Sequence, residues 1–252
     1  MKTAFPRALL AFALSTFVLA AQADEIQVAV AANFSAAAQK IAASFEKDTG
    51  NTVKLSFGAT GKFYAQIVAG APFDVLLAAD QATPGKLVAE GKGLAATRKT
   101  YAIGKLVLWS ADDQLVDPAG AVLKSDRWKH LSVADPKLAP YGEAARETLE
   151  HLKLAEAVKP RLVTAENIGQ AFQFVSTGNA ELGFVALGQV QPADGSKAPG
   201  SMWLVPESFY TPLKQDVVVL AATKSQAAAT AFADYLASPP ARAVIKAYGY
   251  AW

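Results

Sequence analysis

The amino-acid chain has 252 residues, of which 52% are hydrophobic and 18% charged, with a formal net charge of +2 and no cysteine. The lack of cysteine excludes disulfides, thiolate metal sites and cysteine nucleophiles, and the near balance of charges gives no support for binding to nucleic acid or to an anionic membrane surface. A chain of this length can bury a substantial core, either as two modest domains or as one large domain.

The N-terminal residues have the pattern of a secretory signal peptide. Lys2 and Arg7 form a short basic start, residues 8–20 are apolar, and a small-x-small cleavage site follows. The apolar run is too short to span a membrane. We therefore expect cleavage between Ala23 and Asp24, an exported mature chain, and a formal net charge of zero once the two basic residues of the signal are removed.

Strands and helices alternate along the mature chain, which predicts α/β layers with mostly parallel sheets. In the first series, apolar side chains at helical spacing predict a helix that begins near Phe34 and ends before Gly50, which is a plausible C-terminal stop. The whole series is expected to be one compact βαβαβ unit with a strand from Ile26, this helix, a strand over 53–57, a helix over about 62–69 and a buried strand over 74–80.

A second series of elements fills the rest of the chain, and no flexible linker separates it from the first. We expect strands over 105–109, 131–134 and 182–187, helices over about 141–152 and 168–176, and a closing segment with a strand over 216–222 and helices over 227–237 and 240–247. Two ordered crossings near 100–104 and 210–215 would divide the chain into lobe 1 (24–102 and 213–252) and lobe 2 (103–212). Two lobes joined in this way can close on a ligand by a hinge motion.

Four segments place small or hydroxyl-bearing residues where a strand ends and a helix should begin, two in each predicted lobe. The unpaired N–H groups and the positive dipole end of such a helix can hold an anion without a charged side chain. For any single segment an ordinary N-cap is the simpler interpretation, so only the combination favours a ligand site. The segments are Ala32–Ser35, Gly58–Gly61, Asp135–Gly142 and Ala165–Ile168.

Motifs for catalysis are missing from the sequence. The segment Gly58–Phe63 lacks the glycine spacing of a phosphate loop, and the chain contains neither a Gly-x-Ser-x-Gly elbow nor a His-Glu-x-x-His pair. The only histidines, His130 and His151, are more simply surface or helix-end residues. An exported hydrolase is thus an alternative without support, and we expect the protein not to be an enzyme.

A larger set of motifs, in this order and spacing, resembles the periplasmic molybdate-binding proteins of ABC uptake systems, and it covers essentially the whole mature chain. The resemblance implies an α/β, two-lobed periplasmic-binding-protein fold (type II-like), in which each lobe is a mixed, mostly parallel sheet flanked by helices and the ligand lies in the interlobe cleft. The motifs are Ala31–Phe34, Ser56–Lys62, Ala69–Asp74, Ala79-Asp80, Ala134–Pro136, Pro140–Gly142, Gly183–Val185 and Tyr248–Tyr250.

The same resemblance implies a ligand-binding role for four residues. The side chains of Asn33 and Thr60 occupy the family's first-lobe positions, and Tyr141 and Ile168 occupy the positions of its second-lobe backbone donors. Some members add a tyrosine after a strand of the second lobe, where this chain has Ala186, so that hydroxyl is missing here.

The implied ligand is molybdate or tungstate, held as a whole oxyanion without direct protein–metal bonds and with no cofactor. The implied setting is a periplasmic monomer that delivers the anion to a membrane ABC permease and binds no nucleic acid. A binding protein for another tetrahedral oxyanion such as sulfate is the nearest alternative. A small carboxylate is less favoured, because none of the four helix-start segments contains the arginine that usually clamps one.

Overall fold

The structure is a computed structural model that describes residues 23–252. The predicted signal peptide therefore lies, apart from Ala23, outside the described residues. Within the described range, no helix combines the length and the apolar composition that crossing a membrane would require.

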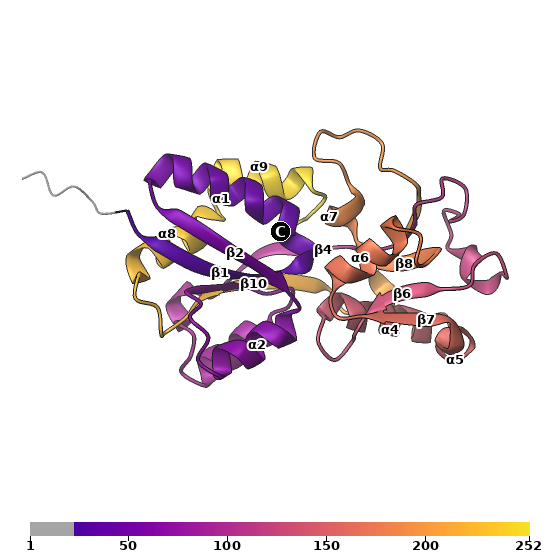
Figure 1. Cartoon of the computed structure of the whole chain (residues 1–252), viewed down its shortest axis with the longest axis horizontal. Helices are drawn as coiled ribbons and strands as arrows, with labels where there is room; N and C mark the ends of the chain where they lie inside the picture. Colours follow the sequence, from indigo (N-terminus) through magenta and orange to yellow (C-terminus); the bar gives the residue numbers. More distant parts are fainter. Residues whose placement is uncertain (1–22) are drawn as a thin grey trace, which may run out of the picture.

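Two five-stranded sheets form two lobes, as Figure 1 shows. The first sheet has the strand order β2-β1-β3-β10-β4. Strand β1 pairs in parallel with β2 and β3, and β10 pairs antiparallel with β3 and β4. Its strands are β1 (Glu25–Ala31), β2 (Thr52–Gly58), β3 (Val75–Leu77), β4 (Lys99–Gly104) and β10 (Leu213–Val219).

The second sheet has the strand order β7-β6-β8-β5-β9. Strand β6 pairs in parallel with β7 and β8, whereas β5 pairs antiparallel with β8 and β9. Its strands are β5 (Leu106–Ser110), β6 (Leu131–Ala134), β7 (Leu162–Ala165), β8 (Leu182–Ala186) and β9 (Ser201–Leu204).

Helices cover both faces of each sheet. Those beside the first sheet are α1 (Ser35–Thr49), α2 (Thr60–Val68), α3 (Ala82–Ala89), α8 (Gln226–Tyr235) and α9 (Pro239–Ala247). Those of the second lobe are α4 (Pro140–His151), α5 (Ala155–Val158), α6 (Ile168–Ser176) and α7 (Leu187–Val190). Short 3-10 turns complete the fold: η1 (Ala32–Phe34), η2 (Ala95–Thr97), η3 (Ala121–Lys124), η4 (Lys159–Arg161) and η5 (Glu207–Phe209).

Alternating side chains of the strands supply the two faces of each sheet. In β1, Val28 and Val30 pack with α1, α8 and α9, while Ala29 between them packs with α2 and α3 on the opposite face. The edge-to-face contact of Phe45 and Phe232, with ring centroids 5.2 Å apart, joins α1 to α8. Burying an aromatic side chain of this size contributes roughly 1.5–3 kcal/mol to the free energy of unfolding.

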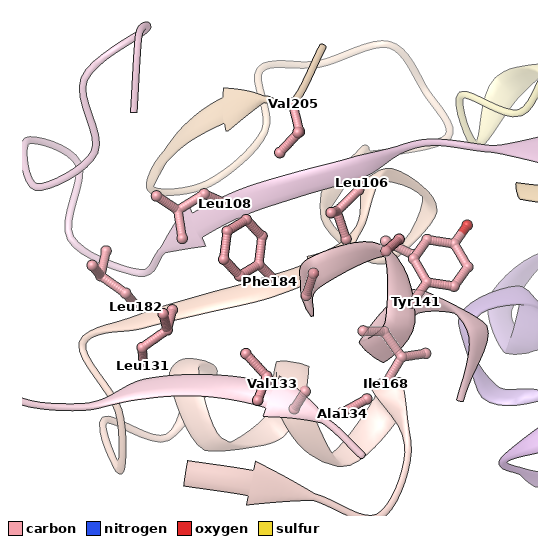
Figure 2. Close-up of a cluster of buried hydrophobic side chains, with 14 of the residues drawn as sticks. Leu106, Leu108, Leu131, Val133, Ala134, Tyr141, Ile168, Leu182, Phe184 and Val205 are labelled. Carbon is pink, nitrogen blue, oxygen red and sulfur yellow. The ribbon is translucent and has the colours of Figure 1, made fainter. Parts of the chain in front are cut away.

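The second sheet is built in the same way. Leu106, Leu108 and Phe184 point into a cluster that also receives residues of α4 (Figure 2), whereas Val107 and Trp109 face the opposite side. Continuous apolar runs in β5 and β8 are therefore explained by burial on both faces, the pattern expected for a central strand.

The predicted α/β, two-lobed architecture is confirmed, and both sheets are mixed. The excess of parallel pairs is not found, because β10 in one sheet and β5 in the other run antiparallel to their neighbours. The strand expected over 74–80 is only β3, and the strand expected over 216–222 begins at Leu213, since β10 pairs with the unpredicted strand β4. The exact lobe boundaries remain a prediction.

The connections between the two sheets run from β4 to β5 and from β9 through η5 to β10. Apolar residues at or just after the ends of β1 and β3 pack into the core of the second lobe, and polar contacts also join the lobes beside these connections. The Gly61 N–H donates to the Leu138 carbonyl oxygen at 2.9 Å, Lys62 Nζ lies 2.7 Å from Glu166 Oε1, and the Gln215 carboxamide reaches the Tyr141 hydroxyl.

Gly104, at the end of β4, should not tolerate a side chain. An added Cβ would lie 2.0 Å from the Tyr141 hydroxyl oxygen and 2.6 Å from Gln215 Nε2, and both side chains are buried. Gly104→Ala is therefore expected to lower the free energy of unfolding by about 1–3 kcal/mol through overpacking, measured by denaturant unfolding followed by circular dichroism.

Gly85→Ala in α3 is the matched control. There the added Cβ would meet the end of the Arg98 side chain, at 2.9 Å. That guanidinium is hydrogen-bonded to Asp216 and Gln81 but sits on a long, partly exposed side chain that can shift more easily than a buried ring, and alanine is preferred over glycine inside a helix by about 0.5–1 kcal/mol. Equal losses of stability in the two variants would contradict the tight packing at Gly104.

Candidate functional site

The first joint of the site follows β1. The strand ends at Ala31, the chain turns through η1, and α1 begins at Ser35. Asn33 in this turn is 2% exposed. Its Nδ2 donates to Gln215 Oε1 at 3.0 Å and lies 3.3 Å from the Tyr250 hydroxyl, which donates in turn to the Asn33 carbonyl oxygen at 2.6 Å. Contacts within the fold therefore hold Asn33 in place.

The second joint follows β2, where α2 begins at Thr60. The N-cap residue, Ala59, has no side chain that could satisfy the first N–H groups of this helix. The Gly61 N–H is taken by the Leu138 carbonyl oxygen at 2.9 Å, so the Thr60 N–H is the first donor of the helix without an acceptor inside it. Thr60 is 1% exposed, and its Oγ1 accepts a hydrogen bond from the Ala79 N–H at 3.1 Å. Because the oxygen is used as an acceptor, the hydroxyl proton can be donated to another group.

The third joint precedes α4 in the second lobe. Ala139 is the N-cap and offers no side-chain cap, and Pro140 occupies the first helical position. Proline has no N–H, so the first backbone donor of α4 belongs to Tyr141. Figure 2 shows the Tyr141 ring at the end of the core cluster next to Ile168.

The fourth joint precedes α6. Asn167 caps this helix, with its side chain accepting from the Gln170 N–H at 3.0 Å. The Ile168 N–H precedes that capped group and has no acceptor within the helix. The Ile168 carbonyl oxygen is held by Gln189 Nε2 at 3.0 Å, which fixes this joint against the end of β8.

All four joints meet at one small cavity. The four residues singled out in the sequence, Asn33, Thr60, Tyr141 and Ile168, all line it, although their role in binding a ligand remains a prediction. No charged side chain lines the cavity, whose other residues are Ala31, Ala32, Gly58, Ala59, Ala79, Ala139, Pro140 and Asn167. Such a lining offers an anion the positive ends of helix dipoles and neutral donors.

Three buried tyrosines surround the pair Asn33 and Gln215 and keep their protons: Tyr250 contacts Asn33, and Tyr101 and Tyr141 contact Gln215. Burial raises the pKa of Tyr101, Tyr141 and Tyr250 above the ordinary value of 10, with neighbouring tyrosines adding to the effect for the first two. Each hydroxyl can therefore act as a neutral donor throughout the neutral and mildly alkaline range.

The charged groups near the cavity lie outside it. Burial raises the pKa of Asp80, an effect opposed by hydrogen bonds from Thr83. Asp80 lines a more open neighbouring groove between the lobes, of about 1000 Å³ empty volume. Lys62 and Glu166 pair across the lobes and are 42% and 48% exposed. Thus no carboxylate faces the space where an anion would sit.

Other residues considered in the sequence lie away from the cavity. Ala186 is fully buried at the end of β8 and is not among the lining residues, and its N–H donates to Gln189 Oε1 at 2.9 Å. His130 lies 3.8 Å from Glu181 on the surface, and His151 stacks on Phe209. Within residues 23–252, no group of three or more His, Asp or Glu side chains is arranged to hold a metal ion.

Sequence reasoning missed Gln215, which links the two lobes under the cavity. It is fully buried, accepts from Asn33 and from the Tyr101 hydroxyl at 3.0 Å, and donates to the Tyr141 hydroxyl at 3.3 Å. A signal was present, because Gln215 alternates with Leu213 and Val217 along a strand. Period-2 alternation places it on their face of the sheet.

Comparison with known proteins agrees with this architecture. A family model described as bacterial extracellular solute-binding protein matches residues 26–251. Two relatives bear the name Molybdate-binding protein ModA. The one from Azotobacter vinelandii is 56% identical over 99% of both chains, and the one from Rhodobacter capsulatus is 48% identical over 98% of both.

Solved structures give the same result. The Azotobacter vinelandii periplasmic molybdate-binding protein superposes with a TM-score of 0.88 at 43% identity, covering 90% of this chain and 99% of the other. The sulfate-binding protein SubI from Mycobacterium tuberculosis H37Rv superposes with a TM-score of 0.72 at 16% identity, covering 90% and 86% of the two chains, which shows a shared fold alone. The family resemblance is thus confirmed, and the chain belongs to the bacterial extracellular solute-binding proteins.

Proposed function

We propose that this protein binds molybdate, and also tungstate, in the periplasm and delivers it as a monomer to a membrane ABC permease. One observation carries the proposal: four helix starts, two from each lobe, converge on a single small cavity that no charged side chain lines. The names of the relatives that match over nearly the full length supply the identity of the anion. Asn33, Thr60, Tyr141 and Ile168 are the proposed contacts.

The donors in the cavity suit a fully ionised tetrahedral oxyanion. Such a dianion accepts a hydrogen bond at every oxygen, and each charge-assisted bond contributes about 1.5–3 kcal/mol. Phosphate near neutral pH often carries a proton and needs an acceptor, which neutral N–H and O–H donors do not provide. Sulfate has the same charge as molybdate but is smaller, so the size of the cavity must discriminate against it.

The residues of the site fit ligand binding better than they fit hydrolysis. Neither histidine lines the cavity, and Thr60 has an N–H donor rather than a base beside its oxygen. A hydroxyl without a base is a weak nucleophile. Neutral donors from two lobes permit release instead, because opening the cleft removes half of them and readmits water.

A thermal-unfolding panel tests the ligand class. Ligand at about 1,000 times its dissociation constant should add roughly 4 kcal/mol of apparent stability. We expect molybdate and tungstate to raise the unfolding temperature, and sulfate and phosphate at the same concentration to have much smaller effects. Equal stabilisation by sulfate would contradict the proposed selectivity, and no shift with any of the four anions would contradict oxyanion binding.

Substitution of Thr60 tests the proposed contact. Thr60→Val keeps the shape but removes the hydroxyl donor, so molybdate affinity measured by calorimetry should fall by about 10- to 100-fold, the value of one charge-assisted hydrogen bond. The same change leaves the Ala79 N–H without its acceptor, which should lower the free energy of unfolding by about 1–3 kcal/mol.

Thr60→Ser is the matched control for that substitution, because it keeps the hydroxyl. It should retain most of the affinity and of the stability. Unchanged affinity in Thr60→Val would place the ligand elsewhere.

Affinity should be independent of pH from about 6 to 9, because the proposed donors do not titrate there and the pKa of each buried tyrosine is raised. Calorimetric titrations across this range check the expectation, and a tenfold fall would reveal a titrating group in the site.

Above about pH 10 the tyrosines of the unfolded chain ionise while the buried ones stay protonated. The unfolded chain then binds fewer protons, so the free energy of unfolding should fall as pH rises.

A further inference from the structure

The Asn33 carboxamide is turned the wrong way for an anion. Its Nδ2 is directed to Gln215 and Tyr250, and its Oδ1 is buried with no hydrogen-bond partner among the described residues. Only one other buried side-chain polar atom in residues 23–252, Ser132 Oγ, shares that condition. An unpaired buried acceptor is unfavourable, and at the wall of a cavity for an anion it would also be repelled by the ligand.

Rotating Asn33 alone does not solve the problem. A half-turn of its carboxamide would exchange Oδ1 and Nδ2, and Oδ1 would then face Gln215 Oε1, which now lies 3.0 Å from Nδ2. Two acceptors at that distance repel each other. The orientation of Asn33 is therefore tied to that of Gln215.

Rotating both carboxamides restores a donor opposite an acceptor between Asn33 and Gln215. It gives up the bond from Asn33 Nδ2 to the Tyr250 hydroxyl, whose proton is donated to the Asn33 carbonyl oxygen. The Gln215 Nε2, in the place of Oε1, would donate to Asn33 Oδ1 and to the Tyr101 hydroxyl, which lies 3.0 Å away. The Tyr101 proton is then given to the Ala78 carbonyl oxygen, at 3.1 Å. The Gln215 Oε1, in the place of Nε2, accepts from the Tyr141 hydroxyl at 3.3 Å, and Asn33 Nδ2 becomes the group that needs an acceptor.

Space for the exchange exists because the two ends of a carboxamide are nearly the same size, so the rotated form fills the same volume. Protonation is not an obstacle either, since each of the tyrosines involved keeps its proton and can serve as donor or acceptor. The side chains of Gln215 and Tyr141 occupy the space where a Cβ at position 104 would lie, so glycine at that position allows their contact.

We propose that Gln215 is a positioning residue for anion binding: its carboxamide turns together with that of Asn33 and thereby presents Asn33 Nδ2, rather than Oδ1, to the bound oxyanion. This inference rests on the proposed function. Gln215 lines no part of the cavity, so it acts through Asn33. Its bond to Tyr141 joins the same rotation to α4 of the second lobe.

A double-mutant cycle on molybdate affinity tests this role. Gln215→Met keeps a similar volume but cannot donate to Asn33 Oδ1, and it should weaken binding about tenfold or more, the value of one donor to a charged group. Asn33→Ala should weaken binding as well. In the Asn33→Ala background, adding Gln215→Met should have little further effect, because the group through which it acts is gone.

Gln81→Met is the matched control. Gln81 also donates its carboxamide N–H groups to the buried network around Asp216, at 3.1 Å, but it contacts neither Asn33 nor Tyr141. It should leave the affinity within about twofold of the unsubstituted protein, as expected for a residue outside the coupled pair. Thermal unfolding without ligand, measured for every variant, separates loss of stability from loss of binding.

Gln215→Glu provides a second test in an isosteric side chain. An ionised carboxylate only accepts hydrogen bonds, so at pH 8 the Glu side chain should keep Asn33 Nδ2 turned away from the ligand and weaken binding. The protonated side chain can again donate a hydrogen bond to Asn33 Oδ1. Affinity should therefore recover as the pH falls towards 5.5 in this variant and not in the unsubstituted protein.

The outcomes distinguish the two proposals. If the unsubstituted protein binds no molybdate, the proposed function fails. Three outcomes would overturn the positioning role of Gln215 while the proposed function stands. They are equal molybdate affinity in Gln215→Met, additive effects in the double-mutant cycle, and no recovery of affinity at low pH in Gln215→Glu.

Discussion

A buried anion must be surrounded by hydrogen-bond donors, and this constraint organises the molecule. Without arginine or lysine at the cavity, the donors can only be backbone N–H groups, hydroxyls and carboxamides, each of which supplies a small part of the stabilisation. Many such groups are needed at one point. A strand-to-helix joint supplies them in a rigid form, and two lobes that lie side by side bring joints from both to one cavity.

The caps of the helices follow from the same constraint. Helices α2 and α4 begin after alanines, whose side chains cannot occupy the first N–H groups. Helix α6 has a conventional cap in Asn167, but this cap serves the Gln170 N–H and leaves the earlier N–H of Ile168, a residue that lines the cavity, without an acceptor in the helix. In an ordinary helix, poor capping costs stability. Here it leaves N–H groups available as hydrogen-bond donors to a ligand.

Direct contacts between the lobes combine a few polar pairs with apolar packing, since Ala31, Ala32 and Ala79 of the first lobe belong to the core cluster of the second. The ion pair of Lys62 and Glu166 is about half exposed, and pairs of this kind contribute about 0–1 kcal/mol. The hydrogen bond from Gly61 to the Leu138 carbonyl adds a similar amount. An anion that contacted both lobes would favour the closed form by the free energy of the donors that the second lobe adds.

The sequence predicts the α/β class, the two-lobed arrangement and the four helix starts, because these depend on local patterns of apolar residues, glycine and hydroxyls. It does not predict β4 or the antiparallel placement of β10, since strand order depends on contacts between segments more than 100 residues apart. Alternation along the strand indicates the face on which Gln215 lies, but its hydrogen-bond partners were hidden for the same reason. Its partners Asn33, Tyr101 and Tyr141 come from three distant segments, and only the folded chain shows that they meet.

The C-terminal segment has a consequence for how the first joint is fixed. Ala251 pairs with Ile103 of β4, near the place where Figure 1 marks the C-terminus, and the Tyr250 hydroxyl donates to the Asn33 carbonyl oxygen at 2.6 Å. These last two residues lie 217 positions apart in the chain. The turn that carries Asn33 therefore gains this support only once both ends of the described chain have packed together, so a change confined to residues 248–251 can disturb a wall of the cavity that the sequence places at the other end.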